Sequence, residues 1–132
     1  MSEVAPHFTN RLRRADRILR RFPAWVRRAA ITFGFRYTVP FFGAARAHIE
    51  EVSDHEVVVR VADRRQVRNH VEGVHAVAMA LSAETATGLL VAMNLQDRVV
   101  PLLVRMNIHY VHRSNGDLTA RAHITPAQAA TL

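Results

Sequence analysis

An apolar stretch of 22 residues, 74–95, places the strongest limit on the fold of this chain. It reads VHAVAMALSAETATGLLVAMNL, contains no proline and is rich in alanine, leucine and methionine. The stretch is too long for one strand, and a helix that is apolar on nearly all sides must be buried against other elements. It therefore predicts a long central helix that ends near residues 94–97 and around which the rest of the chain folds.

The net charge of +7 is concentrated near the N-terminus. All 18 basic residues are arginine, and nine of them fall within residues 1–43, where Glu3 and Asp16 are the only acids. Residues 44–132 carry nine arginines and nine acids, so this part of the chain is electrically balanced. We therefore expect a basic amphipathic helical extension at 1–43 and a separate compact domain at 44–132.

Residues 8–33 have the spacing of an amphipathic helix with one break. Apolar residues recur at intervals of three and four, with arginines between them, at Phe8, Leu12, Ala15, Leu19 and Phe22. Pro23 is expected to break the helix, a second helical piece should follow to Phe33, and residues 33–42 are expected to form an exit loop. Either the apolar stripe packs on the domain with its arginines in solvent, or this helix meets anionic lipid or ligand phosphates. Specific nucleic-acid binding is not expected, because no base-stacking aromatic set alternates with the arginines.

Strand-like alternation flanks the central helix. Apolar and polar residues alternate over 45–62, with a turn at 53–55, which predicts an antiparallel hairpin. A second hairpin is predicted from a strand at 101–111, an Asn-Gly turn at 114–117 and a partner strand at 118–124. The fold class is therefore α+β, with an antiparallel β-sheet wrapped around a long central hydrophobic helix.

Composition excludes several classes of function. The chain has no cysteine, which excludes disulfide scaffolds, thiol nucleophiles and cysteine-ligated metals. It also has no lysine, which excludes a P-loop lysine or a Schiff base. We expect no metal site, because His109 and His112 fall on opposite faces of their predicted strand. No secretory leader or spanning segment is expected, so the protein is predicted to be cytoplasmic, with residues 8–33 as a candidate peripheral membrane contact.

Residues 69–88 are the most specific part of the sequence. They contain Asn69-His70-Val71-Glu72-Gly73-Val74-His75-Ala76, then Glu84 nine residues after His75, then Thr87-Gly88. Together with HRSNGDLTARA at 112–122, this pattern resembles the hotdog-fold acyl-CoA thioesterases, particularly the phenylacetyl-CoA type and an uncharacterised thioesterase-like branch beside it. The resemblance covers residues 44–125 and implies a hotdog fold.

The resemblance implies hydrolysis of acyl-CoA, or a related acyl thioester, to the free acid and thiol, with no cofactor. Glu84 would be the carboxylate acid/base and Asn69 would orient the carbonyl or water. The backbone amides near His75 and Ala76 would hold the oxyanion, since the start of a helix offers unpaired N–H groups. The implied substrate-binding residues are Gly73, Thr87, Gly88, Arg113 and Ser114, with Arg113 meeting the phosphates of coenzyme A. Each site would join the helix start of one subunit to the acid of the other, which implies a homodimer or a dimer of dimers.

Two departures from that family leave other functions open. Ala76 and Val77 stand where the family has two glycines after the histidine. The family also has two further strands after the second hairpin, so the domain is expected to lack the usual last two strands, as a truncated version or one covered by its oligomer. The alternatives are a non-catalytic acyl-thioester-binding or regulatory hotdog protein, and a peripheral membrane-binding module that acts through the basic helix.

Overall fold

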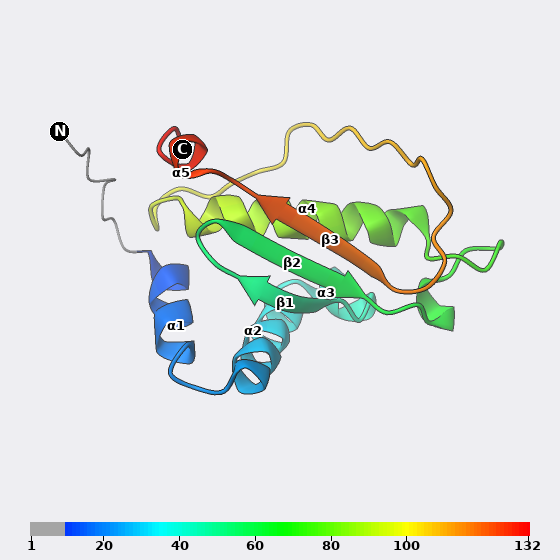
Figure 1. Ribbon diagram of the computed structural model, residues 1–132, viewed down its shortest axis with the longest axis horizontal. Helices are drawn as coiled ribbons and strands as arrows, with labels where there is room; N and C mark the ends of the chain where they lie inside the picture. The colour runs from blue at the N-terminus through cyan, green and yellow to red at the C-terminus, as the bar shows by residue number, and fades with distance from the viewer. Residues whose placement is uncertain (1–9) are drawn as a thin grey trace.

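The computed structural model describes residues 10–132 and shows a mixed α+β fold (Figure 1). A three-stranded antiparallel sheet, in the order β1-β2-β3, lies against the long helix α4 (Ala76–Met93). The remaining elements are α1 (Arg11–Leu19), α2 (Ala24–Thr38), α3 (Pro40–Ala44), β1 (His48–Val52), β2 (Glu56–Val61), the 3-10 turn η1 (Arg65–Val67), β3 (Leu118–His123) and α5 (Pro126–Ala129). Helix α4 packs on β2 and β3, while α2 packs on β1.

The first hairpin is confirmed. Strands β1 and β2 pair antiparallel, with a register shift between Ile49 and Glu51. Their turn is closed by Ser53, whose hydroxyl accepts a hydrogen bond from the Glu56 amide at 2.9 Å. In β2, Val57, Val58 and Val59 are all buried. Because successive side chains of a strand point to opposite faces, both faces of β2 are covered at these residues, and a short apolar run is typical of such a strand.

The central helix is also confirmed, although only one side of it is covered. Ala86, Leu90 and Met93 are almost fully buried, whereas Val77 and Thr87 are exposed. Within residues 10–132, α4 is the one helix whose length and composition would also suit a membrane span. Its contacts with β2 and β3 identify it instead as the core helix of a globular domain.

The N-terminal region is more helical than the sequence predicts. Phe8 lies outside the described residues, but α1 begins one residue after Asn10, whose side chain caps the helix by accepting from the Arg13 amide at 2.7 Å. The exit loop expected at 33–42 is wrong, because α2 continues to Thr38 and α3 follows directly. The physical reason is packing: the rings of Phe35 and Phe42 meet edge to face at 4.9 Å, and Phe42 is fully buried in the core.

Helix α1 is attached to the domain mainly through charge. Asp16 is the buried residue of α1, and its carboxylate accepts hydrogen bonds from Arg27 of α2 and from Arg20, both at 2.7 Å. The apolar stripe faces the domain as expected but does not close onto it. Leu12 and Leu19 instead line a largely apolar cavity of about 340 Å³ between α1, α2, α4 and β1.

The second hairpin is wrong. Residues 99–117 contain no strand, and β3 pairs with β2 rather than with residues 101–111. The side chains that were expected to be half-buried are mostly in solvent, as for Val104, which is 96% exposed. A strand exists only where a neighbour accepts its hydrogen bonds, and within residues 10–132 none lies beside this segment.

Candidate functional site

The residues singled out by the sequence lie in two groups along α4, of which the first surrounds the helix start. Asn69 begins the loop that leads into α4, and its Oδ1 accepts hydrogen bonds from the Val71 and Gly73 amides at 3.0 and 3.1 Å. The backbone N–H of Asn69 donates to the Gly73 carbonyl at 2.9 Å. Asn69 therefore holds the loop closed, and its Nδ2 group is the part left to contact a ligand.

His75 forms the N-cap of α4. Its Nδ1 accepts a hydrogen bond from the Val77 amide at 3.1 Å, and its backbone amide donates to the Val67 carbonyl at 2.7 Å. The imidazole thus shapes the start of the helix. Among the described residues, the Ala76 amide has no acceptor, so one N–H remains free at the positive end of the helix.

A segment from the far end of the chain packs across this loop. The Arg113 guanidinium donates to the Val71 carbonyl, and the Tyr110 hydroxyl donates to the Ala76 carbonyl at 3.1 Å. Gly73 is buried beneath Ser114, and a Cβ added to Gly73 would lie 2.9 Å from the Ser114 carbonyl oxygen. The structure therefore brings Arg113 and Ser114 to the start of α4, and it gives Gly73 a packing role.

Tyr110 is a residue of this site that sequence reasoning missed. It was assigned to one face of a strand that does not form, so nothing in the pattern connected it with Ala76. The signal available was a tyrosine three residues before an arginine that was already singled out.

The second group lies further along α4. Glu84 and Gly88 are half-buried and Thr87 is exposed, with the Thr87 hydroxyl donating to the Ala83 carbonyl at 2.9 Å. A Cβ on Gly88 would lie 3.6 Å from Glu84 Oε1, an ordinary contact. Glu84 follows His75 by nine residues, which places it roughly 13 Å further along the helix at about 1.5 Å per residue. Within one chain the carboxylate and the helix start are therefore too far apart to act on one bond.

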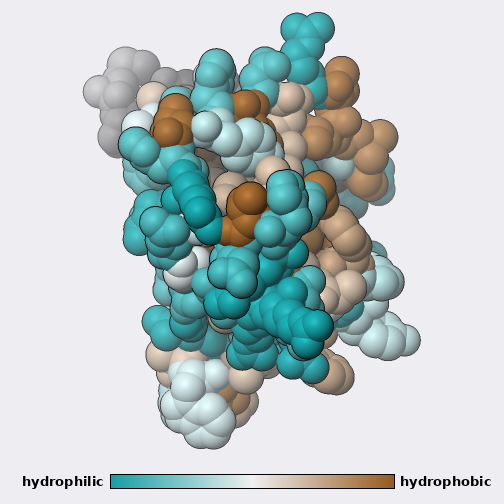
Figure 2. Space-filling model, turned by 90° about the vertical axis from the view of Figure 1, so that its right-hand side faces the viewer, coloured by the Kyte–Doolittle hydropathy of each residue, from teal (hydrophilic) through white to brown (hydrophobic). Residues whose placement is uncertain are grey.

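The uncovered side of α4 is mainly apolar, and its polar side chains include Thr87 and Glu84, the one ionisable residue of the helix. Val77 is about half exposed there, and the irregular segment 99–111 adds further exposed apolar side chains: Val99, Val100, Leu102, Leu103, Val104, Met106, Tyr110 and Val111. Figure 2, viewed from the side facing right in Figure 1, shows apolar residues gathered on one side and hydrophilic residues across the centre. Apolar surface of this extent marks a place where another molecule binds.

The turn before β3 is structural. Gly116 has a φ of +93°, a left-handed conformation that glycine adopts without strain. Asp117 then joins β3 to the end of β2: its Oδ1 accepts from the Asp63 amide at 2.9 Å and its Oδ2 from Arg60. These hydrogen bonds, first from the Asp63 amide and then from Arg60, lower the pKa of Asp117.

Within residues 10–132, no group of three His, Asp or Glu side chains could hold a metal ion.

The fold and this site define a small α+β domain whose candidate site residues lie at the start and in the middle of one long helix. The chain belongs to the family described as "Domain of unknown function (DUF4442)", whose model matches residues 27–131. A crystal structure of a genomics target, APC5556, is similar, with 21% sequence identity and a TM-score of 0.64 over 83% of this chain and 72% of that chain. At this identity the similarity shows a shared fold alone. None of the curated proteins matches the chain.

Proposed function

We propose that this protein is a cytoplasmic hotdog-fold thioesterase that hydrolyses acyl-CoA, or a related acyl thioester, to a free acid and a thiol. One observation carries the proposal: the free Ala76 amide at the start of α4 and the lone carboxylate, Glu84, lie on the same otherwise apolar helix. The antiparallel sheet packed on that helix is compatible with a hotdog-like fold. The residues at 69–88 support the same assignment.

The chemistry follows from these two groups. The Ala76 amide N–H at the positive end of α4 would donate a hydrogen bond to the thioester carbonyl oxygen and stabilise the negative charge that develops there. Glu84 would take a proton from water as the water oxygen bonds to the carbonyl carbon. The carbon–sulfur bond then breaks, and the proton passes to the departing thiolate.

The separation of about 13 Å along one helix requires that the two groups of a site come from different copies. We therefore propose a homodimer in which the uncovered side of α4 faces its equivalent, so that Glu84 of one copy approaches Ala76 of the other. The exposed apolar residues of 99–111 favour such an association.

Four residues are proposed to bind the coenzyme A thioester. Arg113 uses one guanidinium nitrogen on the Val71 carbonyl, which leaves its other N–H groups for phosphate oxygens. Ser114 lies beside it, over Gly73. Thr87 and Gly88 flank Glu84 on the accessible side of α4 and would border the acyl group.

The test is thiol release across a panel of acyl-CoA thioesters, with wild type compared with Glu84→Gln. The amide is nearly isosteric and cannot take the proton, so kcat/KM should fall by about 10²-fold or more while the fold is kept. Glu56→Gln is the matched control, because Glu56 lies in β2, where its carboxylate pairs with Arg121. Equal activity of Glu84→Gln and wild type would disprove the assigned role.

A second function is favoured by two features at the start of α4. Asn69 Oδ1 already accepts two loop amides, and Ala76 and Val77 carry side chains where the resembled family has glycine. A non-catalytic protein that binds acyl thioesters would tolerate both features. If no thioester in the panel is hydrolysed but acyl-CoA raises the melting temperature, this second function replaces the first.

A further inference from the structure

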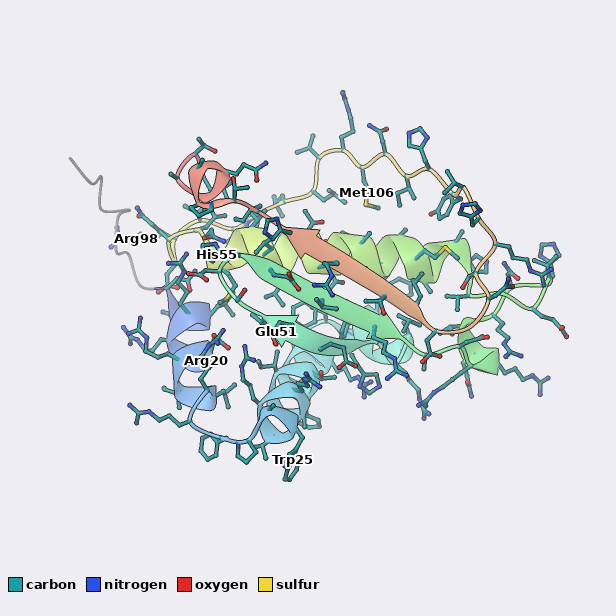
Figure 3. The ribbon with its side chains drawn as sticks, in the orientation of Figure 1. Arg20, Trp25, Glu51, His55, Arg98 and Met106 are labelled. Atoms are coloured by element: carbon teal, nitrogen blue, oxygen red, sulfur yellow. The ribbon has the colours of Figure 1, made fainter. Side chains whose placement is uncertain are left out.

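We propose that the corner between α1 and α2 docks the protein on an anionic lipid bilayer. The corner consists of Arg14, Ile18, Arg21, Phe22 and Trp25, which are all exposed. It lies at the edge of the molecule away from α4 and β3, and Trp25 points away from the sheet (Figures 1 and 3). It also precedes residues 27–131, the part of the chain that matches the family.

The apolar side chains of the corner point away from the core. The domain side of α1 is set by Leu12, Asp16 and Leu19, which line the cavity beneath the helix. At 100° per residue, Ile18 falls on the opposite side of the helix, and it is 52% exposed. Trp25, in the first turn of α2, is 73% exposed. A large apolar side chain in such a position gains nothing from the fold itself.

The apolar surface continues along α2. Phe33 and Tyr37 follow Trp25 at multiples of four residues and therefore form one row on the helix. They are 75% and 84% exposed. Tryptophan and tyrosine favour the boundary between headgroups and acyl chains, because their rings are apolar at one end and polar at the other.

The arginines of the corner are free to meet phosphate. Within the described residues, neither the Arg14 nor the Arg21 side chain has an acidic partner or a hydrogen bond. The one acid of residues 10–43, Asp16, is already occupied by Arg20 and Arg27. The positive charges of Arg14 and Arg21 are therefore not neutralised within the described residues and are available to anionic headgroups.

A bilayer fits this combination better than the other partners of a basic surface. A second copy of the chain would bring like charges together at the same corner. Single-stranded nucleic acid would use aromatic rings for stacking, but an exposed aliphatic side chain such as Ile18 offers no stacking surface. Apolar and aromatic side chains beside unpaired guanidinium groups match the boundary of an anionic membrane.

The test uses Trp25, which is the only tryptophan in the chain. The full chain is titrated with vesicles of phosphatidylcholine alone and with a one-to-two mixture of phosphatidylglycerol and phosphatidylcholine. With the anionic vesicles, we expect the Trp25 emission to move to shorter wavelength and to be quenched by brominated lipid chains. Neither change is expected with phosphatidylcholine alone.

Variants locate the contact. The double variant Arg14→Gln, Arg21→Gln should weaken partitioning into anionic vesicles by about fivefold for each arginine removed. Each basic residue near an anionic surface strengthens binding by about that factor. The matched control is Arg98→Gln with Arg105→Gln, which removes the same charge from exposed arginines of the irregular segment and should have a much smaller effect. Phe22→Ser should also weaken partitioning, whereas Val104→Ser should not.

Three results would overturn the proposal. The first is an unchanged Trp25 spectrum with anionic vesicles. The second is an equal loss of binding in the two double-arginine variants, which would mean attraction by net charge alone. The third is a change in the Trp25 spectrum that anionic vesicles do not cause. If poly(U) causes it instead, the corner is assigned to nucleic acid, and if a rise in protein concentration causes it, the corner is assigned to a second copy of the chain.

Discussion

Replacement of Gly73 by alanine tests how the candidate site is assembled. The new Cβ would lie 2.9 Å from the Ser114 carbonyl oxygen, a backbone atom, and 3.9 Å from the Arg113 side chain. Ordinary contacts of this kind begin at 3.4 Å, so the backbone at Ser114 must move by several tenths of an ångström. That movement would pull the segment 110–114 away from the loop that precedes α4.

Two opposing effects set the magnitude. Overpacking at a site of this kind costs about 1–3 kcal/mol, while the loss of glycine's freedom in the unfolded chain returns about 0.4–1 kcal/mol. The net loss of unfolding free energy is therefore between about 0 and 2.6 kcal/mol, taking the two effects together. For a chain of this length, this corresponds to a fall in Tm of up to roughly 9 °C.

Gly34→Ala is the matched control. A Cβ at Gly34 would have no heavy atom within 4 Å, and the residue lies inside α2. Alanine there should raise the unfolding free energy by about 0.5–1 kcal/mol, because glycine weakens a helix interior. Urea unfolding followed by far-ultraviolet circular dichroism measures both variants. If Gly73→Ala stabilises the protein as Gly34→Ala does, the 113–114 backbone does not lie on the loop and the described site is wrong.

Two further predictions concern charge. Asp16→Asn should lower the unfolding free energy by about 2–3 kcal/mol in urea titrations, because it leaves the buried Arg27 with only a second, more distant carboxylate; no loss would contradict the proposed anchoring of α1. Burial, and then the Arg36 guanidinium, lower the pKa of His48 below its ordinary 6.5. The unfolded chain therefore binds the proton first, and stability should fall as the pH drops through about 6.5. His48→Gln should lessen that fall between about pH 7.5 and 5.5 in thermal melts, whereas the exposed control His123→Gln should not.

The parts of the fold that the sequence predicts are those decided by local pattern. The alternation over 45–62 gave the first hairpin because both strands lie next to each other in sequence and share one buried face. The apolar run at 74–95 gave the central helix because no other structure of that length can bury it. Capping by His75 and the turn at Gly116 are likewise set within a few residues.

The parts that the sequence does not predict depend on contacts between distant segments. Residues 101–111 have the alternation of a strand but no partner in the described chain, while β3 found one in β2. Alternation records which side chains would share a face, and it says nothing about which strand supplies the hydrogen bonds. The anchoring of α1 by Asp16 and Arg27 was hidden for the same reason, because the two residues lie on different helices.

The candidate site contains residues that a local pattern predicts and residues that only contacts between distant segments reveal. Asn69 and His75 were found because their side chains bond to amides only two to four residues away, which a local motif records. Tyr110 was missed because its hydroxyl reaches Ala76 across 34 residues. Glu84 is local to the same helix, yet its distance from Ala76 means that its proposed role depends on a contact outside a single chain. The uncovered side of α4 is therefore the surface on which the proposed chemistry depends, and its apolar character, interrupted by one carboxylate, is what a site shared between two copies would require.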